Sequence, residues 1–251
     1  MDKVQSFRVG SVSISATNPI DAESRITKAA ISGKGGYVCV TNLRMVMYAD
    51  SNPEYAKLMD KSFMNLPDGM PLTWCGKLWG VKGIARTCGP ELFRKMLQNG
   101  DKNLKHFLLG DTDDVLHRIK ETYQHADIVG AEALPFAKVE DFDYKNIAQR
   151  VADSKANIIW TAMTAPKQDE FNQRLYKYLP NIVSVGVGRA FRLSIGQVSQ
   201  APSWAVKLGI GGFFIRRRRW YETGWWYIRS SFTLLKYLVQ IMLHKIIHKD
   251  R

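Results

Sequence analysis

Short apolar segments alternate along this chain with longer segments of helical spacing, and this alternation constrains the fold more than any other feature. The apolar segments are rich in β-branched residues, as strands are. They cover residues 37–42, 106–110, 127–131, 157–162 and 182–188. The predicted helices cover residues 21–31, 45–59 with a break near Pro53, 72–78, 90–97, 113–123, 144–154 and 167–178. Because strands that alternate with helices pair in parallel, the sequence predicts an α/β fold, a Rossmann-like parallel sheet with helices on both faces.

Ligands of such sheets bind beyond the carboxyl ends of the strands, so polar residues that follow the predicted strands are candidates for a site. The candidates are Thr41 and Asn42, then Pro166-Lys167-Gln168, and then Gly186-Val187-Gly188. Each also has a simpler structural interpretation. Asparagine after a strand is commonly a turn residue, proline commonly begins a helix, and Gly-x-Gly without a third glycine and a downstream acid is commonly a tight loop. Taken singly, none of them indicates a function.

Residues 65–71 read Asn-Leu-Pro-Asp-Gly-Met-Pro and place one carboxylate, that of Asp68, between two prolines. Pro-Asp-Gly is ordinary turn chemistry, and on local grounds the sequence predicts a turn. Because proline restricts the backbone, such a turn would hold the carboxylate in a fixed direction. Residues 1–35, by contrast, are mixed and polar apart from the helix predicted at 21–31.

The formal net charge of +13 indicates an acidic partner, namely a nucleic acid, an anionic lipid surface or a phosphorylated substrate. The excess is concentrated in residues 201–251, where ten Lys or Arg against two Asp or Glu give +8 and leave +5 for residues 1–200. We therefore divide the chain into a Rossmann-like domain, residues 1–200, and a C-terminal appendage, residues 201–251.

The appendage combines cations, aromatic residues and a long apolar segment. Four arginines precede Trp and Tyr residues at 220–221 and 225–227, and cations beside such aromatics favour the headgroup layer of a membrane. These arginines are Arg216, Arg217, Arg218 and Arg219. Residues 231–247 are largely apolar, and Lys236, Gln240 and His244 recur at every fourth position to form one polar stripe of a helix.

The seventeen residues 231–247, with a lysine among them, are marginal for crossing a bilayer, so we expect this helix to lie in the membrane interface. The alternative is a helix packed on its own domain, or on a neighbouring subunit of a homo-oligomer.

The cysteines and the N-terminus indicate the compartment. Cys39, Cys75 and Cys88 are odd in number and far apart, which indicates buried thiols in a reducing cytosol and neither a disulfide framework nor a zinc site. Residues 1–10 hold no apolar run, so no secretory signal is expected.

Seven short motifs together resemble, in their order, the WecG/TagA/CpsF family of bacterial glycosyltransferases. They are Asn42, Leu66-Pro67-Asp68-Gly69, Arg86-x-x-Gly89, Leu108-Leu109-Gly110, Pro166-Lys167-Gln168, Gly186-Val187-Gly188-x-Ala190-Phe191 and Ala201-Pro202-x-Trp204, within residues 35–219. The resemblance implies inverting, metal-independent transfer of a sugar from a UDP donor to a polyprenyl-diphosphate-linked saccharide in surface polysaccharide synthesis. The sugar would be N-acetylmannosamine, its uronic acid or another hexose, and no cofactor is implied.

The resemblance also assigns roles to residues and a place in the cell. Inverting transfer needs a base for the proton of the acceptor hydroxyl, and the family's proposed base carries over onto Asp68. The nearby apolar residues Leu66, Met70, Leu72 and Trp74 would raise its pKa. The family's appendage helps to close the site, which implies a peripheral enzyme on the cytoplasmic face of the bacterial inner membrane, with the arginines at 216–219 reaching the donor diphosphate.

The remaining candidates would bind substrate. Asn42, Thr41 and Gln168 are neutral donors and acceptors suited to sugar hydroxyls, and Gly186 and Gly188 would line the same edge. Arg86 would pair with a phosphate in fork geometry, the alternative being a surface ion pair with a carboxylate.

Two departures from the family pattern bear on the donor. Where the family has Thr-x-Asn, this chain has Val40-Thr41-Asn42, so Thr41 should point to the other face of a regular strand. Where the family has Gly-Gly-Ala-Phe-Asp, Arg189 and Arg192 add two cations and replace an acid. These arginines indicate either a more anionic substrate or only an altered surface charge.

Two other functions would also fit a basic, aromatic tail, namely that of a non-catalytic membrane scaffold and that of a nucleic-acid-binding protein. The chain shows no recognised nucleic-acid module, and the long apolar stretch after Trp226 suits lipid better. We therefore expect a nucleotide sugar, a lipid-linked acceptor and an anionic membrane surface as partners, and no nucleic acid.

Overall fold

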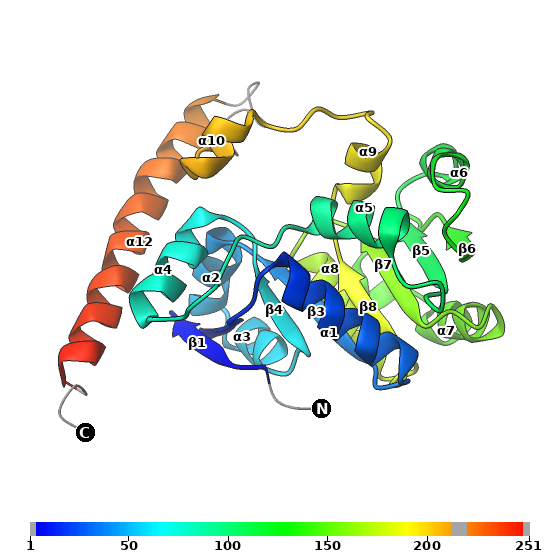
Figure 1. The fold of residues 1–251 in the computed structure, drawn as a ribbon, viewed down its shortest axis with the longest axis horizontal. Coiled ribbons are helices and arrows are strands. Elements are labelled where there is room, and N and C mark those ends of the chain that lie inside the picture. Colours follow the sequence, from blue (N-terminus) through cyan, green and yellow to red (C-terminus); the bar gives the residue numbers. More distant parts are fainter. Residues whose placement is uncertain (1–3, 212–219, 248–251) are drawn as a thin grey trace.

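A computed structural model describes residues 4–211 and 220–247, and within them six parallel strands form the central sheet (Figure 1). The strand order is β4-β3-β8-β7-β5-β6. The strands are β3 (Gly36–Thr41), β4 (Met64–Pro67), β5 (His106–Gly110), β6 (Ile128–Glu132), β7 (Ile158–Ala162) and β8 (Val183–Gly186). The predicted α/β fold with a parallel sheet is confirmed.

The helices are α1 (Pro19–Ile31), α2 (Leu43–Asp50), α3 (Pro53–Asp60), α4 (Met70–Trp79), α5 (Gly89–Asn99), α6 (Asp113–Thr122), α7 (Tyr144–Asp153), α8 (Lys167–Tyr176), α9 (Ala190–Ser194), α10 (Ser203–Lys207) and α12 (Trp220–Ile247), with a short 3-10 turn at Val139–Asp141. Helices α1 to α8 precede the last strand and lie close to where the sequence predicts them, whereas α9, α10 and α12 follow that strand, and of these only α12 overlaps a predicted helix. Helix α1 begins two residues before its predicted start, because the Asn18 side chain accepts hydrogen bonds from the backbone amides of Ile20 and Asp21.

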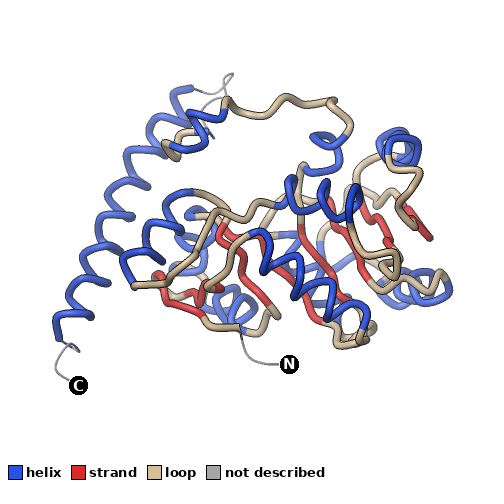
Figure 2. The backbone as a smooth tube through the Cα atoms, in the orientation of Figure 1, coloured by secondary structure: helices blue, strands red, loops and turns tan. Residues whose placement is uncertain are grey.

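Helices cover both faces of the sheet, as predicted (Figure 2). Side chains alternate along β3, so neighbouring residues pack in opposite directions. Val38 lies in a core with α1 and α5, whereas Tyr37 and Cys39 lie in a second core with α2 and α3. A third core joins α7 and α8 to β5 and β7.

Residues 65–67 belong to a strand, which corrects the prediction of a turn for the whole segment 65–71. β4 pairs in parallel with β3, from Met64 opposite Val38 to Pro67 opposite Thr41. A four-residue strand that contains an asparagine and a proline lacks the apolar alternation by which strands are recognised. The Asn65 amide is buried and donates to two backbone carbonyls, those of Ser13 and Met59, each at 2.9 Å.

An antiparallel hairpin of β1 (Ser6–Val9) and β2 (Val12–Ser15) is a second correction, since the sequence predicts no strand before residue 37. Its strands have four residues each and turn at Gly10, whose φ of 55° favours glycine. Val9 and Val12 are buried in the core that also holds α2 and α3. Each strand is too short for its alternation to stand out from the surrounding polar sequence.

The three cysteines Cys39, Cys75 and Cys88 are free and buried, as predicted. Burial raises the pKa of the Cys75 thiol to about 11.

Helix α12 lies along α4 at one end of the molecule (Figure 1), and specific contacts attach it to α2 and α4. Tyr237 is buried, and its hydroxyl donates to Oδ2 of Asp50 at 2.6 Å. Lys245 Nζ donates to the carbonyl of Leu78 at 3.0 Å, and the His244 ring lies 4.9 Å from that of Trp79. One face of the helix therefore packs on its own domain, which is the alternative to a helix that contacts only the membrane.

The opposite face of α12 is apolar and exposed. Its side chains are those of Trp225, Ile228, Phe232, Leu235, Val239, Met242, Leu243, Ile246 and Ile247. They are spaced by three and four residues and so share one side of the helix. In the described ranges 4–211 and 220–247, no helix has the length and apolar character needed to cross a bilayer.

We expect Tyr237→Phe to lower the free energy of unfolding by about 1–2 kcal/mol, because the hydrogen bond to the Asp50 carboxylate is lost. Urea denaturation of the full chain measures this loss. The control is Tyr48→Phe, which removes a hydroxyl from an exposed tyrosine of α2 and should change the free energy by less than about 0.5 kcal/mol. Equal losses in both variants would contradict a stabilising role for the Tyr237–Asp50 bond.

Candidate functional site

The carboxylate of Asp68 is held at the carboxyl end of β4 by backbone geometry. The amide of Asp68 donates to the carbonyl of Thr41 at 2.7 Å and so extends the β3–β4 ladder by one residue. Gly69 follows with a φ of 116°, a conformation that favours glycine, and α4 begins at Met70. The chain thus passes from strand to helix within two residues, and the direction of the Asp68 side chain is fixed by both.

Burial makes Asp68 an unusual carboxylate. Its side chain retains 27% of its surface, and burial raises its pKa to about 6. Arg86 lowers this pKa and Glu91 raises it, both by less than the burial does. The shift has the direction that the apolar residues around the loop predict, and it leaves a group that accepts a proton near neutral pH.

Arg86 lies between two carboxylates. Its Nη1 donates to Oε1 of Glu91 at 3.1 Å, and its Nε lies 3.7 Å from Oδ1 of Asp68. The segment that carries it is fixed to the site strand, since the amide of Thr87 donates to the carbonyl of Pro67 at 2.9 Å. The ion pair with a carboxylate, the simpler alternative for Arg86, is therefore present in the structure.

Gln168, Gly186 and Gly188 are brought together at the carboxyl end of the neighbouring strands. The buried Gln168 side chain accepts a hydrogen bond from the amide of Gly188 at 2.9 Å. A Cβ at Gly186 would lie 2.9 Å from the Gln168 side chain, so the strand must carry glycine for the two to approach this closely. The predicted association of these three residues is thus explained by direct contact.

Strand β3 ends at one buried candidate, Thr41, and is followed by one accessible candidate, Asn42. Asn42 caps α2, because its Oδ1 accepts from the amides of Arg44 and Met45 at 3.0 and 3.3 Å. Its Nδ2 is not part of this cap. Thr41 has no exposed surface, and its hydroxyl donates to the carbonyl of Cys39. Thr41 therefore supports the protein interior in this structure, on the opposite face of the strand from Val40, as the alternation predicts.

Arg192 has an internal partner, which bears on the two extra cations. Its Nε and Nη2 donate to the carboxylate of Asp111 at 2.8–3.0 Å in a fork that joins the end of β5 to α9. Asp111 has a φ of 61° and a side chain only 8% exposed. The positive charge gained at Arg192 is thus balanced by a nearby acid, which fits an altered local charge better than an extra anion site. Arg189 begins α9 beside it.

The appendage covers the first turn of α4, directly after the Asp68 loop. A Cβ at Gly209 would lie 3.4 Å from the Trp74 ring and 3.8 Å from both Met70 and Pro71. Helix α10 lies above α4 and beside α12 (Figure 1). Arg216, Arg217, Arg218 and Arg219 lie outside the described residues.

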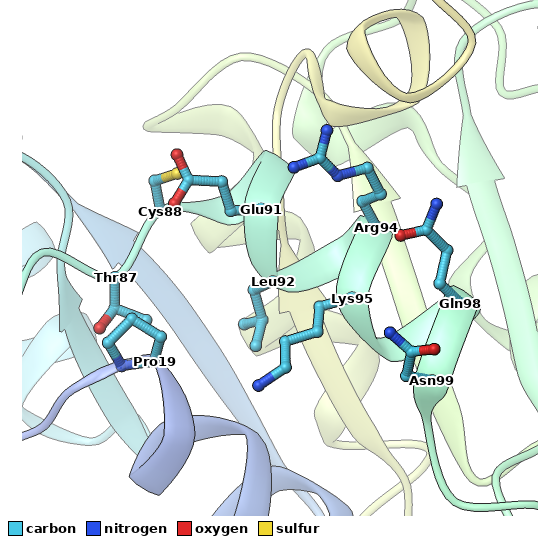
Figure 3. Close-up of a pocket in the computed structure, with 9 residues that line it drawn as sticks. All are labelled: Pro19, Thr87, Cys88, Glu91, Leu92, Arg94, Lys95, Gln98 and Asn99. Atoms are coloured by element: carbon cyan, nitrogen blue, oxygen red, sulfur yellow. The ribbon is translucent and has the colours of Figure 1, made fainter. Parts of the chain in front are cut away.

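A groove of about 400 Å³ lies along α5 and reaches Thr87 and Cys88, which follow Arg86 in the chain (Figure 3). It is lined by Pro19, Thr87, Cys88, Glu91, Leu92, Arg94, Lys95, Gln98 and Asn99. The Glu91 side chain lies at one end of the groove, beside Cys88 (Figure 3). The sequence gives no signal for Glu91 as a site residue, because an acid in the first turn of a helix commonly serves only the helix dipole.

A second buried acid lies next to Gln168 on α8. Burial raises the pKa of Asp169 to about 7, and its Oδ2 accepts from the Tyr55 hydroxyl at 2.5 Å. From the sequence alone this acid is an ordinary first-turn residue of α8, and its contacts with Tyr55 and Cys39 distinguish it. Among residues 4–211 and 220–247, no three His, Cys, Asp or Glu side chains are placed to hold a metal ion.

Comparison with known proteins extends the resemblance found in the sequence. The model of the glycosyl transferase WecG/TagA/CpsF family matches residues 7–250, a wider range than the motifs cover. An N-acetylglucosaminyldiphosphoundecaprenol N-acetyl-beta-D-mannosaminyltransferase of Bacillus spizizenii strain W23 is 26% identical over 218 residues, 84% of this chain and 80% of that protein. The protein of the same name from Bacillus subtilis strain 168 is 25% identical over 185 residues, 72% of this chain and 70% of that protein.

The raised pKa of Asp68 predicts a pH-dependent stability. An aspartate with a pKa near 6 in the folded state and its ordinary 3.8 when unfolded stabilises the fold below pH 4, and this contribution is lost as the pH rises through 6. The asparagine of Asp68→Asn does not ionise, so its contribution to stability does not change over this pH range. We expect the variant to match the natural protein at pH 4 and to exceed its free energy of unfolding by about 2 kcal/mol at pH 7.5. Urea denaturation across this range tests the prediction, and parallel pH curves would contradict it.

Proposed function

The chain belongs to the WecG/TagA/CpsF family of glycosyltransferases, and from this premise we propose that it transfers a hexose from a UDP-sugar to a polyprenyl-diphosphate-linked saccharide, with inversion at the anomeric carbon. The observation that carries the proposal is the Asp68 carboxylate, which is rigidly mounted at the carboxyl end of the sheet with a pKa near 6. The names of two relatives support the type of acceptor, since they specify N-acetylglucosaminyldiphosphoundecaprenol.

Asp68 acts as the general base in this proposal. The acceptor hydroxyl oxygen attacks the anomeric carbon of the donor, the bond from that carbon to the β-phosphate oxygen breaks, and UDP leaves with the electron pair. The hydroxyl proton passes to the Asp68 carboxylate. A base with a pKa near 6 is largely ionised at neutral pH and still holds the proton well enough to assist its removal.

Arg86 is the described cation nearest to this carboxylate. As the proton moves to Asp68, the guanidinium loses one anionic neighbour and can turn toward the charge that develops on the leaving diphosphate. The arginines at 216–219 are proposed to assist it, as the resemblance implies, and they follow the α10 segment that covers the Asp68 loop.

Gln168 and Asn42 are proposed to bind sugar or ribose hydroxyls. Each side chain has its amide oxygen engaged by backbone amides, Gln168 by Gly188 and Asn42 by two amides of α2. Fixed in this way, each side chain offers its NH₂ group as a hydrogen-bond donor. Gly186 and Gly188 let the donor approach the strand ends closely.

N-acetylmannosamine is the first candidate for the transferred sugar, because the names of both relatives specify it. Its uronic acid and other hexoses are tested beside it. The Arg192–Asp111 fork gives no specific support to a uronic acid, because it pairs the extra cation with an acid of the chain itself.

The exposed apolar face of α12 is proposed to bind an anionic lipid surface. Arg229 and Lys236 are exposed beside this face, which would place cations at headgroup level while the apolar side chains enter the interface. Each such cation contributes on the order of 1 kcal/mol at an anionic membrane. A protein attached in this way meets a lipid-linked acceptor at the surface where that acceptor lies.

The proposed activity is tested by offering a panel of UDP-sugars with a synthetic N-acetylglucosaminyl-diphosphate lipid as acceptor. Formation of a lipid-linked disaccharide with one or few donors supports the proposal, and proton NMR of the new linkage reports its anomeric configuration. Absence of product with every UDP-sugar, together with product from a sugar carried on another nucleotide, would contradict the UDP donor.

We expect Asp68→Asn to lower kcat by roughly 10²-fold or more, because the amide cannot accept the proton, and to leave UDP binding unchanged. Initial rates with the preferred donor and calorimetric titration with UDP measure the two effects. The control is Asp60→Asn, which changes a partly exposed aspartate at the end of α3. Unchanged turnover in Asp68→Asn would remove Asp68 from the mechanism.

We expect the double variant Phe232→Glu, Val239→Glu to bind anionic liposomes at least about tenfold more weakly, because two exposed apolar side chains can no longer enter the interface. The control, Ile20→Glu with Ile31→Glu, makes the same changes at exposed positions of α1. Flotation with vesicles of anionic lipid measures binding, and a single-stranded oligonucleotide tests the competing partner. Liposome binding unaffected by the α12 variant, or binding to the oligonucleotide alone, would contradict the membrane role.

A further inference from the structure

Glu91 contacts the candidate site through Arg86, and neither the motifs nor the proposed chemistry gives it a role. Its Oε1 accepts a hydrogen bond from Arg86 at 3.1 Å, while the nearest contact between Arg86 and Asp68 is 3.7 Å, longer than a hydrogen bond. All three side chains are partly exposed, with 24% for Arg86, 27% for Asp68 and 48% for Glu91. The Arg86 guanidinium is thus hydrogen-bonded to Glu91 on α5 and not to the proposed base, Asp68.

We propose that Glu91 is a positioning residue, which holds the Arg86 guanidinium away from Asp68 so that the Asp68 carboxylate stays free to take the acceptor proton. This inference rests on the proposed function of Asp68. It goes beyond it by assigning to a second acid the task of keeping a base and a phosphate-binding cation apart.

The same protein shows what an arginine and an aspartate do without such a competitor. Arg192 donates from Nε and Nη2 to both oxygens of Asp111 at 2.8–3.0 Å. A comparable fork between Arg86 and Asp68 would occupy the oxygens that must receive the proton. It would also stabilise the ionised carboxylate and make Asp68 a weaker base.

Glu91 is available for Arg86 because its usual helical partner is engaged elsewhere. A glutamate commonly pairs with a lysine four residues later, which here is Lys95. Lys95 instead lies 2.6 Å from Glu23 of α1. The Glu91 side chain extends toward Cys88, at the end of the groove away from Asn99 (Figure 3).

The position of Glu91 is also rigid relative to the base. Helix α5 begins against β8, since a Cβ at Gly89 would lie 3.2 Å from the backbone of Val187. The hydrogen bond from the backbone amide of Thr87 to the carbonyl of Pro67 fixes the preceding residues to β4. The backbone that carries Arg86 and the helix start that carries Glu91 are therefore both held against the sheet.

The charged and titratable groups that face Asp68 in the described part of the chain are few. Arg86 favours its ionised form, and Glu91 disfavours it. Cys88, at the start of α5, is the third, and burial raises the pKa of its thiol to about 12, so it is neutral at physiological pH. The charge of Glu91 is thus the one among these that opposes ionisation of the base.

The simpler explanation of Glu91 is that an acid in the first turn stabilises a helix. Glu54 provides a matched control, because it follows Pro53 in the first turn of α3 as Glu91 follows Pro90 in the first turn of α5. Within the described part of the chain, the ion pair found for Glu54 is the one with the nearby Lys57, at 2.7 Å. Glu54→Gln therefore reproduces the effect on a helix start without the effect on Arg86.

The experiment compares Glu91→Gln, Glu91→Asp and Glu54→Gln in the full-length protein. Carbon-13 NMR of the labelled carboxyl group gives the pKa of Asp68, and the pH profile of kcat/KM gives the pKa of the catalytic base. We expect Glu91→Gln to lower both values by about 0.5 to 1 and to reduce the rate at neutral pH. Glu91→Asp, which keeps the charge, should restore most of the difference, and Glu54→Gln should match the natural protein.

Identical Asp68 titrations in the natural protein and in Glu91→Gln would overturn the inference, provided that circular dichroism shows the variant folded. An Asp68 titration that shifts in a protein that transfers no sugar would leave the electrostatic arrangement standing and contradict the proposed function instead. Transfer that depends on Asp68 but has the same pH profile in Glu91→Gln would support the function and overturn the role of Glu91.

Discussion

The hydrogen bond from the Asp68 amide to the Thr41 carbonyl is the contact on which the candidate site depends. It continues the β3–β4 ladder beyond Pro67 and so places the next side chain at the edge of the sheet. Pro67 restricts the backbone before this bond, and Gly69 permits the turn into α4 after it. The turn predicted from Pro-Asp-Gly is therefore shorter and more rigid than the sequence indicates, since a strand reaches to the residue before the carboxylate.

Such a rigid carboxylate is costly, and the structure shows how the cost is distributed. An acid whose pKa is raised by desolvation destabilises the fold at neutral pH, and this holds for the partly exposed Asp68 and for the buried Asp169. Asp169 is partly satisfied by the Tyr55 hydroxyl, whereas Asp68 has only a loose contact with Arg86. The difference fits a structural acid in one case and a group kept reactive in the other.

Local signals predicted the framework well, and contacts between distant residues account for what they missed. Strand 106–110 and the start of α3 at Pro53 follow from apolar runs and proline, which act within a few residues. β4 depends on the hydrogen bonds from the Asn65 side chain to the carbonyls of Ser13 and Met59, and no local pattern in the sequence reveals these bonds. The partners of Arg86 were equally hidden, because Glu91 looks like any first-turn acid until the fold brings the two together.

Helix α4 connects the site to the appendage, because the appendage touches it at both ends. Its first turn, at Met70 and Pro71, lies under Gly209, and its last residues, Leu78 and Trp79, contact Lys245 and His244 of α12. The sequence of α12 does not show which side of the helix packs on the domain, because residues such as Tyr237 and Val239 are suited both to a buried position and to an exposed one. Tyr237 and Ile241 dock into the core that also holds α2 and α3, and the hydrogen bond from Tyr237 to Asp50 adds a polar contact there, so the largely apolar opposite face is left outward. Helix α4 begins directly after the Asp68 loop and contacts the end of α12. The direction in which α12 presents its apolar side therefore depends on α4 and, through it, on strand β4.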